Sequence, residues 1–470
     1  MSNNTSTTPL VVINIVGLTP SMLGADTPHL CALCNDGMMT PVKDVFPAVT
    51  CSAQSSMLTG RMPNQHGIVG NGWYFRDLAE IHFWKQSNHL VQGEKIWHRL
   101  QRHNPQFTVA QLFWWYNMYA DVDYSITPRP HYPADGRKIV DLYSTPTGLH
   151  QSIEAQIGKF PFFNFWGPAS DIRSSRWIVD SAIIEFDSHH PDLQLVYLPH
   201  LDYNLQRIGP DAAAISDDIR AIDHEAGRLI AHVREQGAEV MVVSEYGITA
   251  VDQSISINRV LRQAGLLKVR QSLDWELLDA GASEAFAVAD HQIAHVYIKD
   301  PGNIKRIRRM LQATEGIEHV LDEHDQQQWH INHQRSGELI AVAAPGYWFD
   351  YCYWLNDNKA PDFATTVDIH NKPGYDPLEL FLDPNIPFVK LKIARRLLQK
   401  KLGFRTLLDV IPLDTSLVRG SHGRLADSPD SGPVFISSKP PPESTVKQLT
   451  DVFSAIERHF TGQGGLSYSY

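Results

Sequence analysis

Apolar runs alternate with amphipathic stretches along much of the chain. Leu10 to Val16 is a short run rich in β-branched residues, and similar runs occupy residues 193–202 and 238–247. Between the last two runs, residues 211–237 have the periodicity of a helix. Strands that are apolar throughout and alternate with helices are typical of a parallel sheet covered on both faces. The pattern therefore predicts an α/β fold with a parallel-rich sheet sandwiched between helices.

Polar side chains occur at or just after the ends of the three predicted strands. They are Asn14 in the first strand, His200 and Asp202 after the second, and Glu245 and Tyr246 after the third. The carboxyl ends of parallel strands meet at one edge of a sheet, where α/β proteins bind ligands. We therefore expect a functional site at this edge.

Two regions interrupt the strand and helix alternation. From about residue 73 to 177 the chain is rich in aromatic residues, and we interpret this stretch as an elaboration that walls a pocket, with plain core packing as the alternative. From about 252 to 413 a strand, a helix and a second strand indicate a small α+β cap. The expected organisation is a core of residues 1–251 and 414–470 with a cap of residues 252–413. A last amphipathic helix is expected over residues 446–460.

Composition and charge exclude some classes of protein. The chain has 41 Lys and Arg residues against 52 Asp and Glu residues, a formal charge of −11. This acidity argues against a nucleic-acid partner or an anionic membrane. The apolar run near the start is too short to span a bilayer and has no basic residue before it, so we expect a cytoplasmic protein without a membrane span. Four cysteines in 470 residues do not make a disulfide scaffold.

One segment carries a family resemblance. FPAVTCSAQSSMLTGRMPNQHGIVGN, residues 46–71, resembles the nucleophile segment of the alkaline phosphatase superfamily, in its nucleotide pyrophosphatase/phosphodiesterase branch. In that branch the segment supplies a nucleophilic Thr at a helix start and an Asn, which correspond to Thr50 and Asn71. A hydroxyl at a helix N-terminus meets unpaired N–H groups and a dipole that favours phosphate oxygens. YLPHLDYNLQRIGP, VVSEYGI and GSHGR resemble the later motifs, in the same order.

The resemblance implies an alkaline phosphatase-like core with two zinc ions at the carboxyl edge of the sheet. The chain departs from the family at the metal ligands. Val16 stands where the family has its first Asp, Gln206 replaces a His, and Glu245–Tyr246 replaces an Asp–His pair. Asp202 and His422 match the family pattern. Because Val binds no cation and Tyr is an uncommon zinc ligand, we expect no normal di-zinc centre, and either one divalent ion, zinc first, or none.

Several other residues are candidates for a rebuilt metal site. Gln206, Glu245 and His200 could add to Asp202 and His422, His200 because it lies two residues before Asp202 at an extended strand end. Further candidates, for which hydrogen-bonded structural roles are the alternative, are Asp290, His291 and His295 in one segment and Asp368 and His370 in another.

Two arginines are candidates for holding the substrate, and Tyr246 is a further catalytic candidate. Arg207 and Arg419 neighbour the expected site and could bind phosphate oxygens, although solvated surface arginines are the alternative. Tyr246 could donate a hydrogen bond to an oxyanion in place of a metal.

The resemblance implies a phosphodiesterase-like or nucleotide pyrophosphatase-like hydrolase. Thr50 would attack phosphorus in a small phosphorylated metabolite and form a phosphothreonine, with an altered or reduced metal site. The alternatives are a non-catalytic descendant that binds a phosphorylated ligand or a protein partner, and a scaffold within a biosynthetic assembly.

Overall fold

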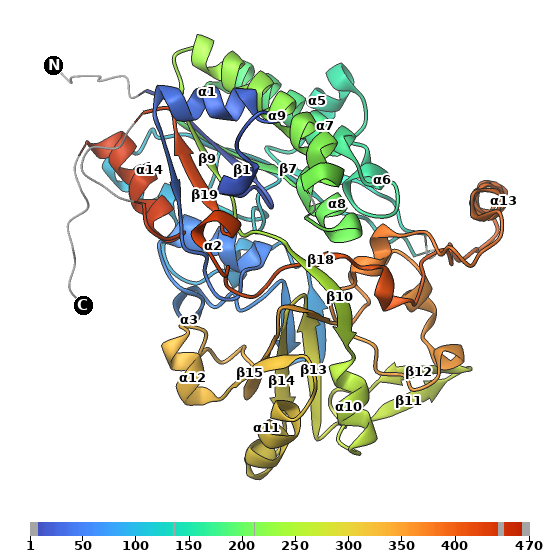
Figure 1. The fold of residues 1–470 in the computed structure, drawn as a ribbon. Helices are drawn as coiled ribbons and strands as arrows, with labels where there is room; N and C mark the ends of the chain where they lie inside the picture. The colour runs from blue at the N-terminus through green and yellow to red at the C-terminus, as the bar shows by residue number, and fades with distance from the viewer. Residues whose placement is uncertain (1–7, 135–136, 211, 440–445, 463–470) are drawn as a thin grey trace.

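A central sheet of eight strands forms the core of the protein (Figure 1). The computed structural model describes residues 8–134, 137–210, 212–439 and 446–462. The strands follow in the order β2 (Met38–Pro41), β19 (Val434–Ser437), β9 (Glu239–Val243), β1 (Leu10–Ile15), β8 (Leu193–Leu198), β5 (Val109–Leu112), β6 (Tyr124–Pro128) and β7 (Leu142–Thr145). The five strands from β9 to β6 are parallel, whereas β19 and β7 run against their neighbours.

Helices cover both faces of this sheet because successive residues of a buried strand point to opposite sides. In β1, Val11, Ile13 and Ile15 belong to one apolar cluster, while Leu10 and Val12 belong to another. The first face is covered by α1 (Pro28–Asp36), α5 (Leu149–Ile157), α7 (Ile172–His189), α8 (His200–Ile208) and α9 (Ala212–Glu235). The second face is covered by α2 (Thr50–Thr59), α4 (Ile96–His103) and α14 (Asp451–Thr461). The predicted α/β sandwich is confirmed.

A second layer of structure lies beside the carboxyl edge of the main sheet (Figure 1). Its antiparallel sheet has the order β13 (Ala285–Asp290), β14 (Ile293–Ile298), β16 (Leu339–Ala343) and β15 (Ile317–Leu321). Its helices are α10 (Ile257–Gln263), α11 (Ile304–Gln312) and α12 (Glu323–Gln328). Apart from the three strands of the joining sheet described next, the other strands and α-helices of the chain are β3 (Gly72–Phe75), β4 (Glu80–Phe83), β11 (Val269–Ser272), β12 (Trp275–Leu278), α3 (Pro63–His66), α6 (Phe162–Phe165) and α13 (Val389–Lys401).

The two layers are joined by a short three-stranded sheet. Its middle strand, β10 (Thr249–Ile255), pairs in parallel with β17 (Gly346–Phe349) and antiparallel with β18 (Gly420–Ser421). β10 is the strand through which the chain leaves the main sheet. It is therefore hydrogen-bonded both to β17 of the second layer and to β18, which lies in the segment that returns to the core. No helix in the described ranges has the length and apolar character needed to cross a membrane.

Three details differ from the sequence-based expectation. The aromatic-rich stretch contributes β5, β6 and β7 to the main sheet, so it is part of the core as well as a wall. The first strand expected in the cap is a hairpin of β13 and β14, because the chain turns at His291 and Gln292. The last helix begins at Asp451, and Val446 and Leu449 are buried in the segment before it. Asp211, the first residue of the predicted helix 211–237, lies outside the described residues, and the helix is observed over Ala212–Glu235.

The start of α1 is held by a side chain from a distant helix. Thr27 precedes the helix, but its hydroxyl accepts a hydrogen bond from the N–H of Gly24 instead of capping the helix. The free N–H groups of His29 and Leu30 donate to the Asp223 carboxylate of α9, at 3.1 and 2.9 Å. Helix ends need such acceptors, because a buried N–H without one is costly.

We expect Asp223→Ala to lower the free energy of unfolding by about 1–3 kcal/mol, because it leaves two N–H groups of α1 without an acceptor. Urea denaturation at neutral pH measures this. Asp217→Ala on the exposed side of α9 is the matched control and should change stability by less than about 0.5 kcal/mol. Equal effects of the two variants would contradict the capping role.

Candidate active site

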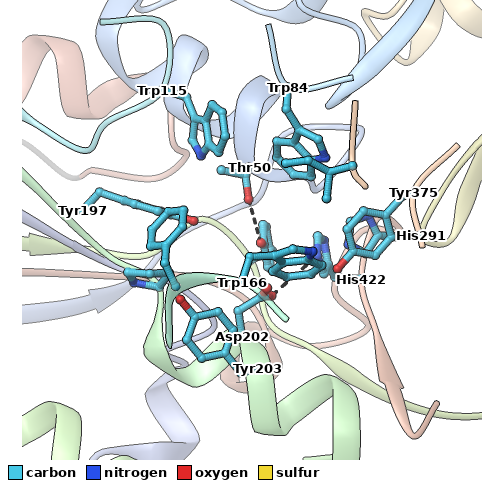
Figure 2. A pocket seen from close by; sticks show the side chains of 14 residues that line it. Thr50, Trp84, Trp115, Trp166, Tyr197, Asp202, Tyr203, His291, Tyr375 and His422 are labelled. Atoms are coloured by element: carbon cyan, nitrogen blue, oxygen red, sulfur yellow. Dashed lines mark hydrogen bonds and ion pairs between the residues drawn. The ribbon is translucent and has the colours of Figure 1, made fainter. Parts of the chain in front are cut away.

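A pocket opens at the carboxyl edge of the main sheet, on the side that faces the second layer (Figure 2). Counted with its open mouth, the cavity has a volume of about 510 Å³. Aromatic rings make up most of its wall. The lining residues are Thr50, Trp84, Trp115, Phe165, Trp166, Tyr197, Pro199, Asp202, Tyr203, Tyr246, His291, Ile369, Tyr375 and His422.

Thr50 is the first residue of α2, and its hydroxyl faces this pocket. Its Oγ1 lies 2.9 Å from the Oη of Tyr246, which follows β9 (Figure 2). Burial raises the pKa of Tyr246 well above its usual value, so the phenol keeps its proton. A neutral phenol next to Thr50 can donate a hydrogen bond to the threonine oxygen or to an anion bound there.

Four aromatic rings lie one against the next along one side of the pocket, with the middle pair tilted by 38° and the outer two pairs stacked. Tyr246 lies on His422 with ring centroids 3.7 Å apart, and His422 lies 3.7 Å from His291. His291 in turn lies 3.5 Å from Tyr375. We call these four residues the ring column. It brings together the end of a core strand, a late loop, and two segments of the second layer.

The hydrogen bonds of His422 determine which of its nitrogens carries a proton. Its Nδ1 donates to the carbonyl oxygen of Ala48 at 2.8 Å. Burial lowers the pKa of His422 well below its usual value, so the ring is neutral and Nε2 keeps a free lone pair. This Nε2 lies 3.9 Å from Oδ1 of Asp202. The imidazole therefore presents a base or a metal ligand to the pocket.

Asp202 is held by a chain of hydrogen bonds through Gln206. The Nε2 of Gln206 donates to Oδ2 of Asp202 at 2.8 Å, and Tyr375 Oη donates to Oε1 of Gln206 at 2.8 Å. The other oxygen of Asp202, Oδ1, is buried without a partner among the described residues. Burial raises the pKa of Asp202 to about 7, against the opposing effect of the Gln206 hydrogen bond.

Glu245 is a second buried carboxyl group beside Thr50. Gln54 and Asn14 each donate from a side-chain N–H to its Oε1 at 2.6 Å. Its Oε2 has no partner among the described residues. Burial raises the pKa of Glu245 to about 8, so the group holds a proton at neutral pH. Glu245 lies behind the pocket wall and is not among the lining residues, which include one acid, Asp202, two neutral imidazoles, His291 and His422, and no Lys or Arg.

Asn71 and Asp290 support the start of α2 from behind. The Asn71 Oδ1 accepts the N–H of Cys51 at 3.0 Å, and its Nδ2 donates to Asp290 at 3.1 Å. Asp290 also accepts from the backbone N–H of Asn71 and from Nδ1 of His291. Burial raises the pKa of Asp290 to about 6. Asn71, expected to be catalytic, is committed to these contacts and does not line the pocket.

Comparison with known proteins now identifies the family. The sequence profile of the family described as type I phosphodiesterase / nucleotide pyrophosphatase matches residues 10–376, which is more than half of the chain. The chain belongs to this family. The predicted resemblance is therefore confirmed at the level of the family.

One curated relative and two solved structures are similar to this phosphodiesterase-family chain. An uncharacterized pyrophosphatase/phosphodiesterase of Schizosaccharomyces pombe is 24% identical over 257 residues, which are 51% of this chain and 44% of that protein. The chain thus aligns with less than half of that relative's length.

The two solved structures are similar over almost the whole chain. Murine ectonucleotide pyrophosphatase/phosphodiesterase 5, in an inactive form with AMP, has a TM-score of 0.59 at 17% identity and covers 98% of this chain and 97% of its own. Phosphonoacetate hydrolase from Sinorhizobium meliloti with phosphonoformate has a TM-score of 0.60 at 14% identity, with 95% and 94% covered. At these identities the two structures support the fold alone.

Several residues that the sequence nominated lie outside the pocket of this phosphodiesterase-family protein. His200 begins α8 instead of extending β8, so it turns away from Asp202 and lies 3.0 Å from Asp218. Arg207 donates to Asn204 and to the carbonyl oxygen of Ser170. The side chain of Arg419 is exposed. Neither arginine is among the residues that line the pocket, and their role in holding phosphate stays a prediction.

The second-layer candidates divide in the same way. His291 reaches the pocket because it sits at the tip of the β13–β14 hairpin, with a φ of 61° in the left-handed region. Both nitrogens of His295 are used in contacts with the backbone of Val69 and Gly337. Asp368 and His370 are not among the lining residues. The contacts of His295 fit the alternative of a hydrogen-bonded structural role, and Asp368 and His370 lie outside the pocket lining.

The donor set does not fit the two zinc ions that the family resemblance implies. Only Asp202 and His422 present free donor atoms at the matching position, because the oxygen of Gln206 accepts from Tyr375 and its nitrogen faces Asp202. At the other position Glu245 already accepts hydrogen bonds from Gln54 and Asn14 on Oε1, and the neighbouring family positions hold Tyr246 and Val16. Within the described ranges, no three His, Cys, Asp or Glu side chains come together as a metal site. Zinc sites in proteins use at least three protein ligands.

Sequence reasoning missed two supporting residues. Gln54 follows Thr50 by four residues, so helical periodicity places both on one face of α2, and this signal was available. Tyr375 had no such signal, since only the tertiary fold stacks it on His291.

We expect fewer than two tightly bound metal ions per chain, because the family's ligand positions hold Val16, Gln206 and Tyr246. Elemental analysis after purification without chelator measures the content. Any ion that is found should be reduced by His422→Ala and retained by the exposed-histidine variant His89→Ala. Two zinc ions per chain would contradict this expectation.

We expect the stability advantage of Glu245→Gln over the wild type to grow as pH rises. Folding raises the pKa of Glu245 from its usual 4.5 to about 8, so between these values the folded protein keeps a proton that the unfolded chain has lost. The free energy of unfolding then falls with pH, by at most about 1.4 kcal/mol per pH unit from this group. Urea denaturation between about pH 5 and 8 measures the difference. Glu235→Gln, at an exposed position, should track the wild type at every pH.

Proposed function

We propose that this chain cleaves a phosphoric ester or pyrophosphate bond in a small phosphorylated molecule, with Thr50 as the nucleophile. The observation that carries the proposal is the position of the Thr50 hydroxyl. It stands at the first turn of α2, opens into the aromatic pocket, and lies 2.9 Å from Tyr246 Oη. A helix N-terminus attracts phosphate, and a hydroxyl there is placed to attack phosphorus.

The proposed chemistry proceeds in two displacements. The Thr50 oxygen forms a bond to phosphorus and its proton passes to Nε2 of His422, which hands that proton to the leaving oxygen as the bond from phosphorus to this oxygen breaks. His422 can accept the proton because its ring is neutral and its Nδ1 is already bonded to Ala48. Water then attacks the phosphothreonine, releases phosphate or a phosphomonoester, and restores the threonine hydroxyl.

Hydrogen-bond donors take the role of positive charge in this proposal. The phenol of Tyr246 and, while it holds a proton, the carboxyl group of Asp202 can each donate to a phosphate oxygen, and the N-terminus of α2 adds a favourable dipole. No step requires a metal ion. Because Glu245 and Asp202 lose their protons near pH 8 and pH 7, phosphate binding should weaken as the pH rises through this range.

The pocket wall restricts the class of substrate. Trp84, Trp115 and Trp166 present large apolar faces, which suit a planar ring or an apolar group attached to the phosphate. AMP in the murine relative and phosphonoformate in the bacterial hydrolase are ligands of those proteins. For this chain we propose a small phosphorylated metabolite with a ring or apolar substituent.

Binding without turnover is the second candidate, and one observation favours it. No Lys or Arg lines the pocket, and its free metal donors are limited to Asp202 and His422. A family site that has lost its cations can hold a phosphorylated ligand and still fail to stabilise the charge that develops during transfer.

We expect Thr50→Ala to reduce hydrolysis of bis(p-nitrophenyl) phosphate and p-nitrophenyl phosphate by about 100-fold or more, whereas Thr50→Ser keeps part of the activity. Mass spectrometry of the quenched wild type should find phosphate on the peptide that contains Thr50. Thr314→Ala, a surface threonine in the second layer, is the control and should behave as the wild type.

The same assays separate the two candidates. Full activity of Thr50→Ala would contradict the covalent mechanism. A wild type that shows no turnover, yet is stabilised against heat by phosphorylated compounds in a manner that depends on Thr50, would favour the binding function.

A further inference from the structure

The helix α13 stands apart from the rest of the molecule. It projects from one side of the body (Figure 1, far right), and none of its 13 residues is buried. One side of the helix is attached, because Val389 and Ile393 pack against a small apolar cluster. The opposite side carries large apolar side chains that are exposed and belong to no apolar cluster of the described residues.

These apolar side chains form a continuous stripe. Leu391, Leu398 and Leu402 are 70%, 57% and 66% exposed, and their spacing of seven and four residues places them on one face of the helix. Phe388 and Phe404, 84% and 64% exposed, flank the two ends of the helix. We call these five residues the leucine stripe. Water-facing leucines in such a row are unusual on a surface without a function.

Basic residues border the leucine stripe. Between residues 388 and 405 the sequence has seven Lys and Arg residues and no Asp or Glu, although the whole chain has a formal charge of −11. Lys390 and Lys401 project on one side of the stripe and Arg395 on the other, and all three are exposed. Lys392 and Arg396 are instead paired with Asp409 at the base of the helix.

We propose that α13 lies flat on a membrane that contains anionic lipid, with the leucine stripe inserted among the acyl chains and the bordering Lys and Arg side chains against the headgroups. A leucine and phenylalanine face with basic flanks is the composition of helices that bind at the bilayer interface. Cations next to an anionic leaflet add attraction over a distance of about one Debye length.

Other occupants of this surface fit less well. A second copy of the chain would bring two basic helices together, and like charges across a symmetric interface repel. Nucleic acid would pair with the cations but leave the five apolar side chains of the stripe in water. Attachment through α13 also needs no membrane-spanning helix, in agreement with the described part of the chain.

The test is flotation of the full chain with lipid vesicles. The protein should float with vesicles that contain roughly one third phosphatidylglycerol in phosphatidylcholine, bind pure phosphatidylcholine about tenfold less, and detach as salt rises to about 0.5 M. Two triple variants, Leu391→Ser/Leu398→Ser/Leu402→Ser and Lys390→Glu/Arg395→Glu/Lys401→Glu, should each lower the bound fraction by about tenfold or more.

A matched control comes from α11, which is also basic. Lys305, Arg306 and Arg309 are exposed there, but the apolar partners Ile307 and Leu311 are buried. Lys305→Glu/Arg306→Glu/Arg309→Glu should therefore float as the wild type does. Melting temperatures should be equal for all variants, which separates loss of binding from loss of folding.

Two results would overturn the proposal. One is equal flotation of the wild type and both α13 variants, or equal loss in the α11 control, since binding would then not depend on this helix. The other is that the wild type forms a dimer in solution without lipid and the triple leucine variant is a monomer. The leucine stripe would then be an interface between copies of the chain.

Discussion

The pocket depends on the stacked column formed by Tyr246, His422, His291 and Tyr375. Stacked aromatic pairs contribute roughly 0.5–1.5 kcal/mol each beyond the area they bury, but the larger effect is on geometry. The column fixes the plane of His422, and the Ala48 carbonyl fixes its rotation, so Nε2 is directed toward Asp202. It also connects the end of β9 to the second layer, so residues of both the core and the second layer line the pocket.

Burial governs the charge state of the two acids beside Thr50. A zinc centre keeps its carboxylates ionised, because the cation offsets their desolvation. Here burial is not offset by any cation in the pocket lining, and the pKa values of Asp202 and Glu245 rise to about 7 and 8. The nearest charged group in the adjoining cavity, Lys372, is already bound to Asp376 and Glu379. The acids therefore act as hydrogen-bond donors through much of the neutral range.

The sequence predicted the sheet and much of the site, because both depend on local signals. Apolar runs identified β1, β8 and β9, and the residues at their ends placed Asp202, Glu245 and Tyr246 at one edge. Two candidates lie differently from what spacing suggested, and the reason is the same for both. His200 and Gln206 were judged by spacing, whereas a helix begins at residue 200 and redirects the first, and Tyr375 occupies the oxygen of the second.

The net charge of the whole chain also conceals a local basic segment. The formal charge of −11 argued against an acidic membrane, yet the charge is not uniform, since residues 388–405 are strongly basic. Tyr375 stacks on His291 from a segment more than eighty residues later, and only the tertiary fold brings the two together. Such contacts leave no periodic trace in a single sequence.

The pairing of β10 has a consequence for how a molecule enters and leaves the pocket. Its ladder to β17 and β18, together with the hydrogen bond from Gln292 to the carbonyl oxygen of His422, ties the second layer to the core along its whole junction. A clamshell motion would break these bonds at once, so rigid-body opening is a slow route. A molecule instead passes through the mouth that the pocket already has, and the large rings in the wall, among them Trp84 and Trp166, limit the size of what fits.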